Sequence, residues 1–364
     1  MRIAIAGGGT GGHLFPGIAV AEEFLKRDPH NRVIFIGTRR GIEHRLLKKM
    51  GYELKLIDVE GLKGKGWRTL IRSVYAIPKS MIESGRILAD FRPDAVLGVG
   101  GYASGPAVLT ARLMGIPTAI AEQNALAGIT NRILGKFVDQ IFLTYAQSKE
   151  RFDVRKVRVT GNPVRAAFAA RLNEAPKTSA FRQLLIFGGS QGAAAINRTV
   201  VAMLPMLKRI PDRIRVVHQT GERDLASVRQ AYTQAGVEAE VQSFIVDMAS
   251  VYAASDLIIC RAGATSLAEI TAAGKASVLI PFPYAANDHQ TENALAMVRA
   301  GASVMIRESE LSAEALYSLV ETLLKDGERL QTMEKKSKAL GRPGAAAEIV
   351  DVCLRLAAGK NKNR

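Results

Sequence analysis

Residues 2–17 read RIAIAGGGTGGHLFPG, an apolar run followed by a glycine cluster and the start of a helix-like segment. This order is typical of the strand–loop–helix unit that opens a parallel α/β sheet. Five of the six positions from Gly7 to Gly12 are glycine, which lets backbone N–H groups approach a phosphate at a helix N-terminus. His13 follows directly and adds a group able to transfer protons near neutral pH.

The alternation of strand and helix patterns continues from this unit and then restarts. Strand patterns lie at 2–6, 32–37, 94–100, 117–123 and 140–145, with helical patterns such as 16–27 and 42–50 between them. Near residue 161 the order begins again with RQLLIFGGSQG (182–192), a helix at 193–207, and strands at 214–219, 241–245, 257–263 and 276–281. We predict an α/β chain of two Rossmann-like domains whose strand ends face a common cleft. The expected domains are 1–161 and 162–341, with a last helix at about 342–357 packing on the first domain and a basic tail at 358–364.

Composition narrows the class of protein. The chain has 364 residues, 48% hydrophobic and 23% charged, as expected of a globular protein with two domains. The net charge is +16, and residues 1–161 hold 25 Lys and Arg against 14 Asp and Glu, which predicts an anionic partner. Cys260 and Cys353 lie in apolar stretches, so we expect buried thiols and a reducing compartment. Glycines interrupt the uncharged run 3–21, which excludes a membrane span there.

The first glycine loop matches G-x-G-x-x-G at Gly7, Gly9 and Gly12, yet an NAD site also needs an acid after the second strand. Thr38, Arg39 and Arg40 occupy that place, which argues against NAD and leaves NADP as an alternative. Glycine loops at 98–106 and 187–192 exceed the needs of one dinucleotide. The sequence has no P-loop, H-E-x-x-H, paired C-x-x-C or Asp-x-Asp, so we expect no metal site.

Seven segments together resemble one family: GGGTGGHLFPG (7–17), GVGGYASGP (98–106), EQNALAGITNR (122–132), GNPVR (161–165), FGGSQGA (187–193), CRAGATSLAEI (260–270) and DHQTENA (288–294). The chain is similar over its length to the N-acetylglucosaminyltransferases of peptidoglycan synthesis. The resemblance implies a GT-B fold and inverting transfer of N-acetylglucosamine from UDP-GlcNAc to the 4-hydroxyl of MurNAc in lipid I, giving β-1,4-linked lipid II without a cofactor. It also implies peripheral attachment to the cytoplasmic membrane face, with the first domain taking the acceptor and the second UDP-GlcNAc. Cell-wall and division proteins are implied as partners.

The resemblance assigns substrate-binding residues. It implies that Arg165 and the backbone of Ile245 lie beside the uracil, Glu269 binds the ribose and Ser190 contacts the diphosphate. The transferred sugar is expected among Thr10, Gly11, Gly12, Asn124 and Gln290, and the donor diphosphate at the helix start formed by Ala264, Thr265, Ser266, Leu267, Ala268 and Glu269. For the acceptor diphosphate we expect the loop of Gly100, Gly101, Tyr102 and Ser104. Glu269 is also the ribose-type carboxylate that the first half lacks, although a helix dipole alone favours an acid there.

Inverting transfer needs a base for the acceptor hydroxyl. His13 is the first candidate because its ordinary pKa suits proton transfer near neutrality. Glu122 is the weaker candidate, and a histidine that only orders the loop is the alternative to both. His30, His44 and His218 lie in ordinary surroundings and are expected to be structural, whereas His289 adjoins Gln290 and the expected sugar site.

Residues 61–86 combine cations with apolar residues spaced three or four apart, which is typical of an interfacial helix. The expected membrane face comprises Lys65, Trp67, Arg68, Ile71, Arg72 and Tyr75. A helix that buries this apolar stripe in the core is the alternative. Nucleic acid is disfavoured because the segment has only Trp67 and Tyr75 for stacking. An NADP oxidoreductase, a UDP-GlcNAc 2-epimerase and a non-catalytic lipid binder stay open as other functions.

Overall fold

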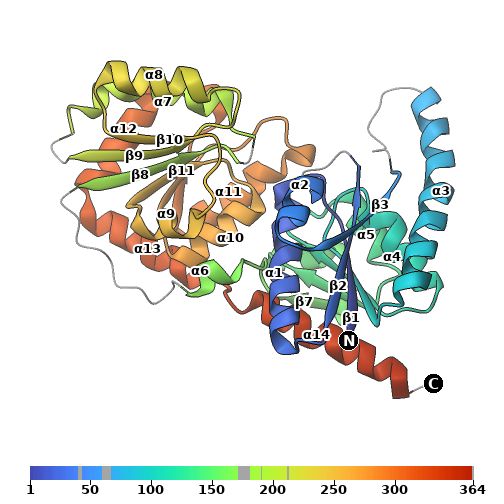
Figure 1. Cartoon of the computed structure of the whole chain (residues 1–364). Helices are drawn as coiled ribbons and strands as arrows, with labels where there is room; N and C mark the ends of the chain where they lie inside the picture. The colour runs from blue at the N-terminus through green and yellow to red at the C-terminus, as the bar shows by residue number, and fades with distance from the viewer. Residues whose placement is uncertain (40–42, 60–66, 171–180, 190, 211–212, 363–364) are drawn as a thin grey trace. The chain divides into compact units, whose positions relative to one another are not determined.

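The computed structural model describes residues 1–39, 43–59, 67–170, 181–189, 191–210 and 213–362. The chain separates into two compact units (Figure 1). Unit 1 comprises Met1–Ala166 together with Arg342–Arg364, and unit 2 comprises Ala167–Gly341. Each unit is a parallel sheet covered by helices on both faces, so the α/β class expected from the sequence is confirmed.

Unit 1 has a seven-stranded sheet in the order β3-β2-β1-β4-β5-β6-β7, and all described pairs are parallel. Its strands are β1 (Arg2–Ala6), β2 (Arg32–Thr38), β3 (Glu53–Ile57), β4 (Ala95–Gly98), β5 (Thr118–Glu122), β6 (Gln140–Leu143) and β7 (Val157–Val159). Its helices are α1 (Gly11–Arg27), α2 (Glu43–Lys49), α3 (Trp67–Phe91), α4 (Ser104–Leu113), α5 (Ile129–Leu134) and α14 (Ala345–Lys362), with short 3-10 turns at Ala146–Arg151 and Val154–Lys156. Across the sheet, the strand numbers fall from β3 to β1 and then rise from β4 to β7, so the switch point lies between β1 and β4. In parallel α/β sheets, ligands bind at such a switch point, outside the carboxyl ends of the strands.

Alternate residues of the central strands serve the two faces of this sheet. Ile3 and Ile5 of β1 pack in a core with α1, α2 and α14, whereas Ala4 and Ala6 pack in a core with α3, α4 and α5. Burial on both faces explains why the strands read as continuous apolar runs. Helix α14 lies beside α1 (Figure 1), and its Ile349 and Val350 are wholly buried in the core of unit 1.

Unit 2 repeats the arrangement with six strands in the order β10-β9-β8-β11-β12-β13, again parallel. The strands are β8 (Arg182–Phe187), β9 (Ile214–Gln219), β10 (Ala239–Gln242), β11 (Leu257–Cys260), β12 (Ser277–Leu279) and β13 (Ser303–Met305). The helices are α6 (Ala166–Ala170) at the junction, α7 (Ala194–Leu207), α8 (Leu225–Ala235), α9 (Met248–Ala254), α10 (Ala264–Ala273), α11 (His289–Arg299), α12 (Ala313–Lys325) and α13 (Gly327–Leu340), with 3-10 turns at Ala286–Asp288 and Glu308–Glu310.

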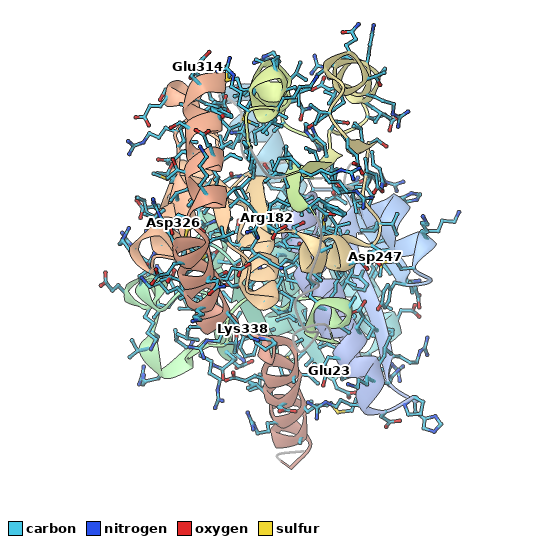
Figure 2. All side chains as sticks on the ribbon, turned by 90° about the vertical axis from the view of Figure 1, so that its left-hand side faces the viewer. Glu23, Arg182, Asp247, Glu314, Asp326 and Lys338 are labelled. Atoms are coloured by element: carbon cyan, nitrogen blue, oxygen red, sulfur yellow. The ribbon has the colours of Figure 1, made fainter. Side chains whose placement is uncertain are left out.

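Asp326 separates the last two helices of unit 2. Its backbone N–H donates to the Thr322 carbonyl at the end of α12, and its carboxylate accepts from the Arg329 N–H at 2.9 Å in the first turn of α13. Figure 2 shows Asp326 between these helices, which run along the same side of the unit. A carboxylate that satisfies a free N–H at a helix start stabilises the new helix.

Several element boundaries differ from the sequence expectations. Helix α1 begins at Gly11 and not at Pro16, because the glycines of its first turn are helical despite their low propensity. Strands β3, β7 and β13 have no counterpart in the predicted set: the first carries charged side chains at a sheet edge and the other two are three residues long. The strand expected at 241–245 ends at Gln242.

Candidate active site

Two glycine loops, one after β1 and one after β4, meet at the carboxyl end of the unit 1 sheet. The Gly7 N–H donates to the Ile36 carbonyl at 3.0 Å, and the Gly8 N–H donates to the Gly100 carbonyl at 3.3 Å. Gly101 has a φ of +80°, and a Cβ there would lie 2.3 Å from the Gly8 oxygen. The two loops therefore touch backbone to backbone, a packing that only glycine permits.

His13 lies in the first turn of α1 and reaches across to the second loop. Its Nδ1 is 3.1 Å from the Val99 carbonyl oxygen and 3.3 Å from Oε1 of Gln123. A carbonyl oxygen only accepts hydrogen bonds, so Nδ1 carries the hydrogen and Nε2 carries the lone pair. The ring lies against Gly100, where a Cβ would come within 2.5 Å of Nδ1. The neutral imidazole is thus held in the form that accepts a proton at Nε2.

Glu122 ends β5 and is only 3% exposed. Its Oε1 accepts from the backbone and side-chain nitrogens of Asn124, at 3.0 and 3.3 Å. Its Oε2 accepts from the Gly128 N–H and from Nδ2 of Asn131, both at 2.9 Å. Four donors from the segment that follows, from Asn124 to Asn131 in α5, occupy this carboxylate, which indicates a role in ordering that segment and favours His13 as the base.

The expected sugar-binding residues of unit 1 lie at the same carboxyl end of the sheet, after β1 and β5. Thr10 is exposed at the start of α1, followed by Gly11 and Gly12 in its first turn. Asn124 follows β5 on the loop that Glu122 orders, and its amide nitrogen is directed to Glu122.

The second glycine loop, expected at the acceptor diphosphate, has residues of two kinds. Gly100 and Gly101 have positive φ, and Tyr102 is half exposed. Ser104 is wholly buried as the first residue of α4, so its hydroxyl lies inside the unit. A direct contact of the Ser104 side chain with a ligand is therefore not supported, and the loop offers its backbone and Tyr102.

Arg165 belongs to unit 1. Its guanidinium carbon stands 4.8 Å from the ring centre of Phe15 on α1, a cation–π contact. The expected position beside the uracil stays a prediction.

Unit 2 has its own glycine loop after β8, in contact with the end of β9. Gly192 has a φ of +77°, and a Cβ there would lie 1.9 Å from the Thr220 carbonyl oxygen. Gln219 links this loop to a third segment: its Nε2 donates to the Gly189 carbonyl at 2.9 Å and its Oε1 accepts from the Ile245 N–H at 2.8 Å. The backbone position of Ile245 is therefore fixed by Gln219, and its expected contact with the uracil stays a prediction. Ser190 lies outside the described residues.

Helix α10 starts at the carboxyl end of β11, the neighbour of β8 in the sheet. Ser266 and Ala268 are partly exposed, Thr265 and Glu269 are nearly buried one turn apart, and Leu267 is in the core. Leu267 can therefore serve a ligand through its backbone alone. Burial raises the pKa of the nearby Cys260 thiol, and the Glu269 carboxylate raises it further. Both Cys260 and Cys353 are buried free thiols.

Gln290 lies in the first turn of α11, and its Oε1 accepts from the Phe282 N–H at 3.0 Å. Its Nε2 then remains the group that can donate to a sugar hydroxyl. Asn287 and Asp288 precede the helix with φ of +53° and +52°, a left-handed pair that is uncommon outside glycine. The bend they form sets the start of α11, where His289 also lies.

His218 is structural, as the sequence suggested. It is wholly buried, with Nδ1 3.0 Å from the Tyr232 hydroxyl and Nε2 3.1 Å from Oδ1 of Asn197. Burial lowers the pKa of His218 to about 3, so it is neutral at physiological pH. His30 and His44 are exposed.

The described residues contain no group of three or more His, Cys, Asp or Glu placed to hold a metal ion. None of the helices among them has the length and apolar character needed to cross a membrane.

The residues of the expected membrane face are not described with their side chains. Lys65 lies outside the described residues, and α3 includes Trp67, Arg68, Ile71, Arg72 and Tyr75 with side chains that are also outside the description.

Sequence reasoning missed Gln123 and Gln219, two buried glutamines at the carboxyl ends of strands. A polar residue at the carboxyl end of an otherwise apolar strand pattern could have identified both, because ligands of parallel α/β sheets bind outside the carboxyl ends of the strands.

Two family models match the chain, the glycosyltransferase family 28 N-terminal domain over residues 3–143 and the family 28 C-terminal domain over residues 183–349. Among curated proteins, one from Syntrophus aciditrophicus is 54% identical over 97% of this chain and 98% of its own. One from Myxococcus xanthus is 52% identical over 98% of this chain and 93% of its own. Both are named UDP-N-acetylglucosamine--N-acetylmuramyl-(pentapeptide) pyrophosphoryl-undecaprenol N-acetylglucosamine transferase.

Solved structures are similar over nearly the whole chain. The crystal structure of Acinetobacter baumannii MurG matches with a TM-score of 0.78 and 32% identity, covering 97% of this chain and 99% of that one. A UDP-GlcNAc 2-epimerase from Neisseria meningitidis, bound to UDP-GlcNAc, matches with a TM-score of 0.68 at 16% identity, covering 98% and 100%. At that identity the second likeness concerns the fold alone.

Proposed function

Because the chain belongs to glycosyltransferase family 28, we propose that His13 is the base in its transfer of N-acetylglucosamine to lipid I. The chain has the GT-B fold of two α/β domains. Its donor is UDP-GlcNAc and its acceptor is the MurNAc-pentapeptide carried on undecaprenyl diphosphate. The NADP oxidoreductase and the 2-epimerase left open by the sequence are therefore set aside.

The observation that carries the proposal is the distance of 3.1 Å between Nδ1 of His13 and the Val99 carbonyl oxygen, from which we infer the hydrogen on Nδ1. Nε2 then takes the proton of the MurNAc 4-hydroxyl as that oxygen attacks the anomeric carbon. The new bond forms on the face opposite to UDP, so the configuration inverts and a β-1,4 linkage results. The N-terminus of α1, which begins at Gly11 beside His13, directs its helix dipole toward an anionic group of a substrate.

In unit 2, the donor is held by the segments that follow β8, β10, β11 and β12 at the carboxyl end of the sheet. Glu269 receives the ribose hydroxyls, the Ile245 carbonyl receives the uracil N–H, and Nε2 of Gln290 donates to the sugar. The N-terminus of α10 stabilises the charge that develops on the leaving diphosphate, because its N–H groups and dipole are fixed before the reaction.

The test replaces His13 with alanine. We expect H13A to lower kcat by about 10²- to 10⁴-fold, the contribution of a positioned base, with little change in the KM for UDP-GlcNAc. The matched control is H30A, because His30 is exposed on the same unit and is expected to keep normal kinetics. Steady-state rates with a lipid I analogue decide the matter, and near-normal kcat in H13A would remove His13 from the mechanism.

We also infer a peripheral position on the cytoplasmic face of the membrane, supported by one surface of unit 1. Ile129, Ile133 and Phe137 are spaced four residues apart along α5 and the turn after it, and are 63%, 53% and 47% exposed. Arg132 and Lys136 are exposed beside them. An exposed apolar stripe flanked by cations fits an anionic lipid surface.

This inference is tested with vesicles. The double variant I133E/F137E is expected to lose most binding to vesicles that contain anionic lipid, measured by co-sedimentation at moderate salt. M50E is the control, since Met50 is a 40% exposed apolar residue of unit 1 directly after α2, which covers the face of the sheet opposite to α5. Equal sedimentation of both variants and the unmodified chain would contradict membrane docking through α5.

A further inference from the structure

Gln123 directly follows β5 and lies beside His13, although it is not among the catalytic or substrate-binding residues expected from the sequence. We propose that Gln123 is a positioning residue that keeps the proton of neutral His13 on Nδ1. The proposal rests on the role of His13 as the base.

The orientation of the Gln123 amide follows from its neighbours. Its Nε2 donates to the Val99 carbonyl at 3.0 Å and to the Ala121 carbonyl at 3.2 Å. The opposite orientation would place Oε1 against two carbonyl oxygens with no hydrogen between them. Oε1 is therefore directed to Nδ1 of His13, 3.3 Å away. Gln123 is 2% exposed, so bulk water does not compete for these bonds.

This arrangement surrounds Nδ1 of His13 with acceptors. If the proton moved to Nε2, the lone pair on Nδ1 would face the Val99 oxygen and the Gln123 oxygen, and both interactions would become repulsive. The same two oxygens stabilise the imidazolium that forms when Nε2 accepts a proton, because Nδ1 remains a donor. Gly100 confines the ring, because its backbone lies so close to the imidazole that an added Cβ would be 2.5 Å from Nδ1. Gln123 thus acts on the reaction through the protonation site of His13.

The experiment uses the full chain labelled with ¹⁵N-histidine. At a pH where His13 is neutral, its ¹⁵N shifts report which ring nitrogen carries the hydrogen, and the signals missing from H13A provide the assignment. The test variant is Q123M, which keeps the length of the side chain and removes its hydrogen bonds. The control is Q183M, because Gln183 is also buried but lies in β8 of unit 2.

In the unmodified chain and in Q183M we expect the hydrogen on Nδ1 and normal kinetics. In Q123M we expect a mixture of the two tautomers, and a kcat about 10- to 100-fold lower, less than the loss of the whole base. The KM for UDP-GlcNAc should change less than twofold, because the buried side chain of Gln123 bonds to Val99, Ala121 and His13 and so acts on the proton transfer.

Three results bear on the proposal without ambiguity. A hydrogen on Nε2 in the unmodified chain would overturn it, whether or not Q123M folds. Unchanged tautomer and unchanged kcat in Q123M would overturn it as well. A changed tautomer with normal kcat would support the positioning role of Gln123 and would instead exclude His13 as the base.

Discussion

At the scale of single residues, the chemistry of unit 1 depends on contacts between positions far apart in the chain. His13 receives its orientation from Val99 and Gln123, which lie 86 and 110 residues further along. The sequence predicts His13 as a base because a histidine ends a glycine loop. It does not predict the tautomer, since the acceptors that decide it meet the ring only after β1, β4 and β5 are side by side.

Gly100 provides a test of this confinement. Alanine at this position would place its Cβ 2.5 Å from Nδ1 of His13 and would have to adopt a φ of +92°. We expect G100A to displace the imidazole and to lower kcat at least tenfold, with a loss of stability of about 1–3 kcal/mol from the backbone conformation.

The control for Gly100 is G115A. Gly115 has a φ of +68°, and a Cβ there meets no atom within 4 Å. G115A should therefore lose similar stability while keeping normal kcat. Denaturant unfolding and steady-state kinetics of both variants separate strain from displacement, and equal kcat in the two would argue against confinement of His13 by Gly100.

At the scale of elements, each glycine loop lies beside the carboxyl ends of neighbouring strands of its own unit. The sequence predicts the loops because their glycines follow apolar strand patterns. Their side-chain supports are harder to predict: Glu122 orders the loop at 124–131 and Gln219 joins the segments of Gly189 and Ile245. Both supports are buried polar residues at strand ends, where composition alone does not distinguish a ligand contact from a structural role.

The hydrogen bonds of Gln219 predict that the glycine loop at Gly189 and the segment at Ile245 bind the nucleotide together and not independently. Q219M removes the bonds to the Gly189 carbonyl and the Ile245 N–H. The Gly189 carbonyl still accepts from the Gly192 N–H at 3.1 Å, whereas the N–H of the buried Ile245 loses this partner. Such a loss costs about 1–3 kcal/mol, and part of that cost should appear as weaker nucleotide binding. We expect the Kd for UDP, measured by titration calorimetry, to rise about tenfold, which corresponds to about 1.4 kcal/mol.

Gln183 again supplies the comparison for Q219M. Gln183 is buried near the amino end of β8, and the glycine loop follows the carboxyl end of the same strand. Q183M should keep the Kd for UDP within twofold of the unmodified chain. A normal Kd in Q219M would mean that the two segments hold the nucleotide independently of Gln219.

At the scale of the whole molecule, the chain enters unit 2 after Ala166 and returns to unit 1 at Arg342. The repeat of strand, glycine loop and helix predicts two α/β domains from the sequence. We also expect from the sequence a last helix that packs on the first domain, while the residues it contributes to that core depend on tertiary packing: Ile349, Val350 and Cys353 lie with α1 and the unit 1 sheet. Unit 1 is therefore discontinuous in the sequence, whereas unit 2 is continuous.

This discontinuity predicts different behaviour of fragments. A chain of residues 1–166 lacks α14 and leaves the α1 side of its sheet partly uncovered. Loss of a single buried aliphatic side chain costs about 2–5 kcal/mol, and whole domains are stable by only about 5–15 kcal/mol. We expect 1–166 to show no cooperative thermal unfolding, followed by far-UV circular dichroism. Residues 167–341, with their complete core, should unfold cooperatively.

Restoring α14 should rescue the first fragment. Gly161 packs against Arg342, where a Cβ on the glycine would lie 2.4 Å from that of the arginine. A short glycine–serine linker can therefore join residues 1–166 to 342–364 without strain, and we expect the joined chain to regain cooperative unfolding. An otherwise identical chain with I349D/V350D is the control, because charges at these wholly buried positions prevent α14 from packing. If 1–166 alone unfolded at the same temperature as the joined chain, α14 would cover unit 1 without being needed for its fold.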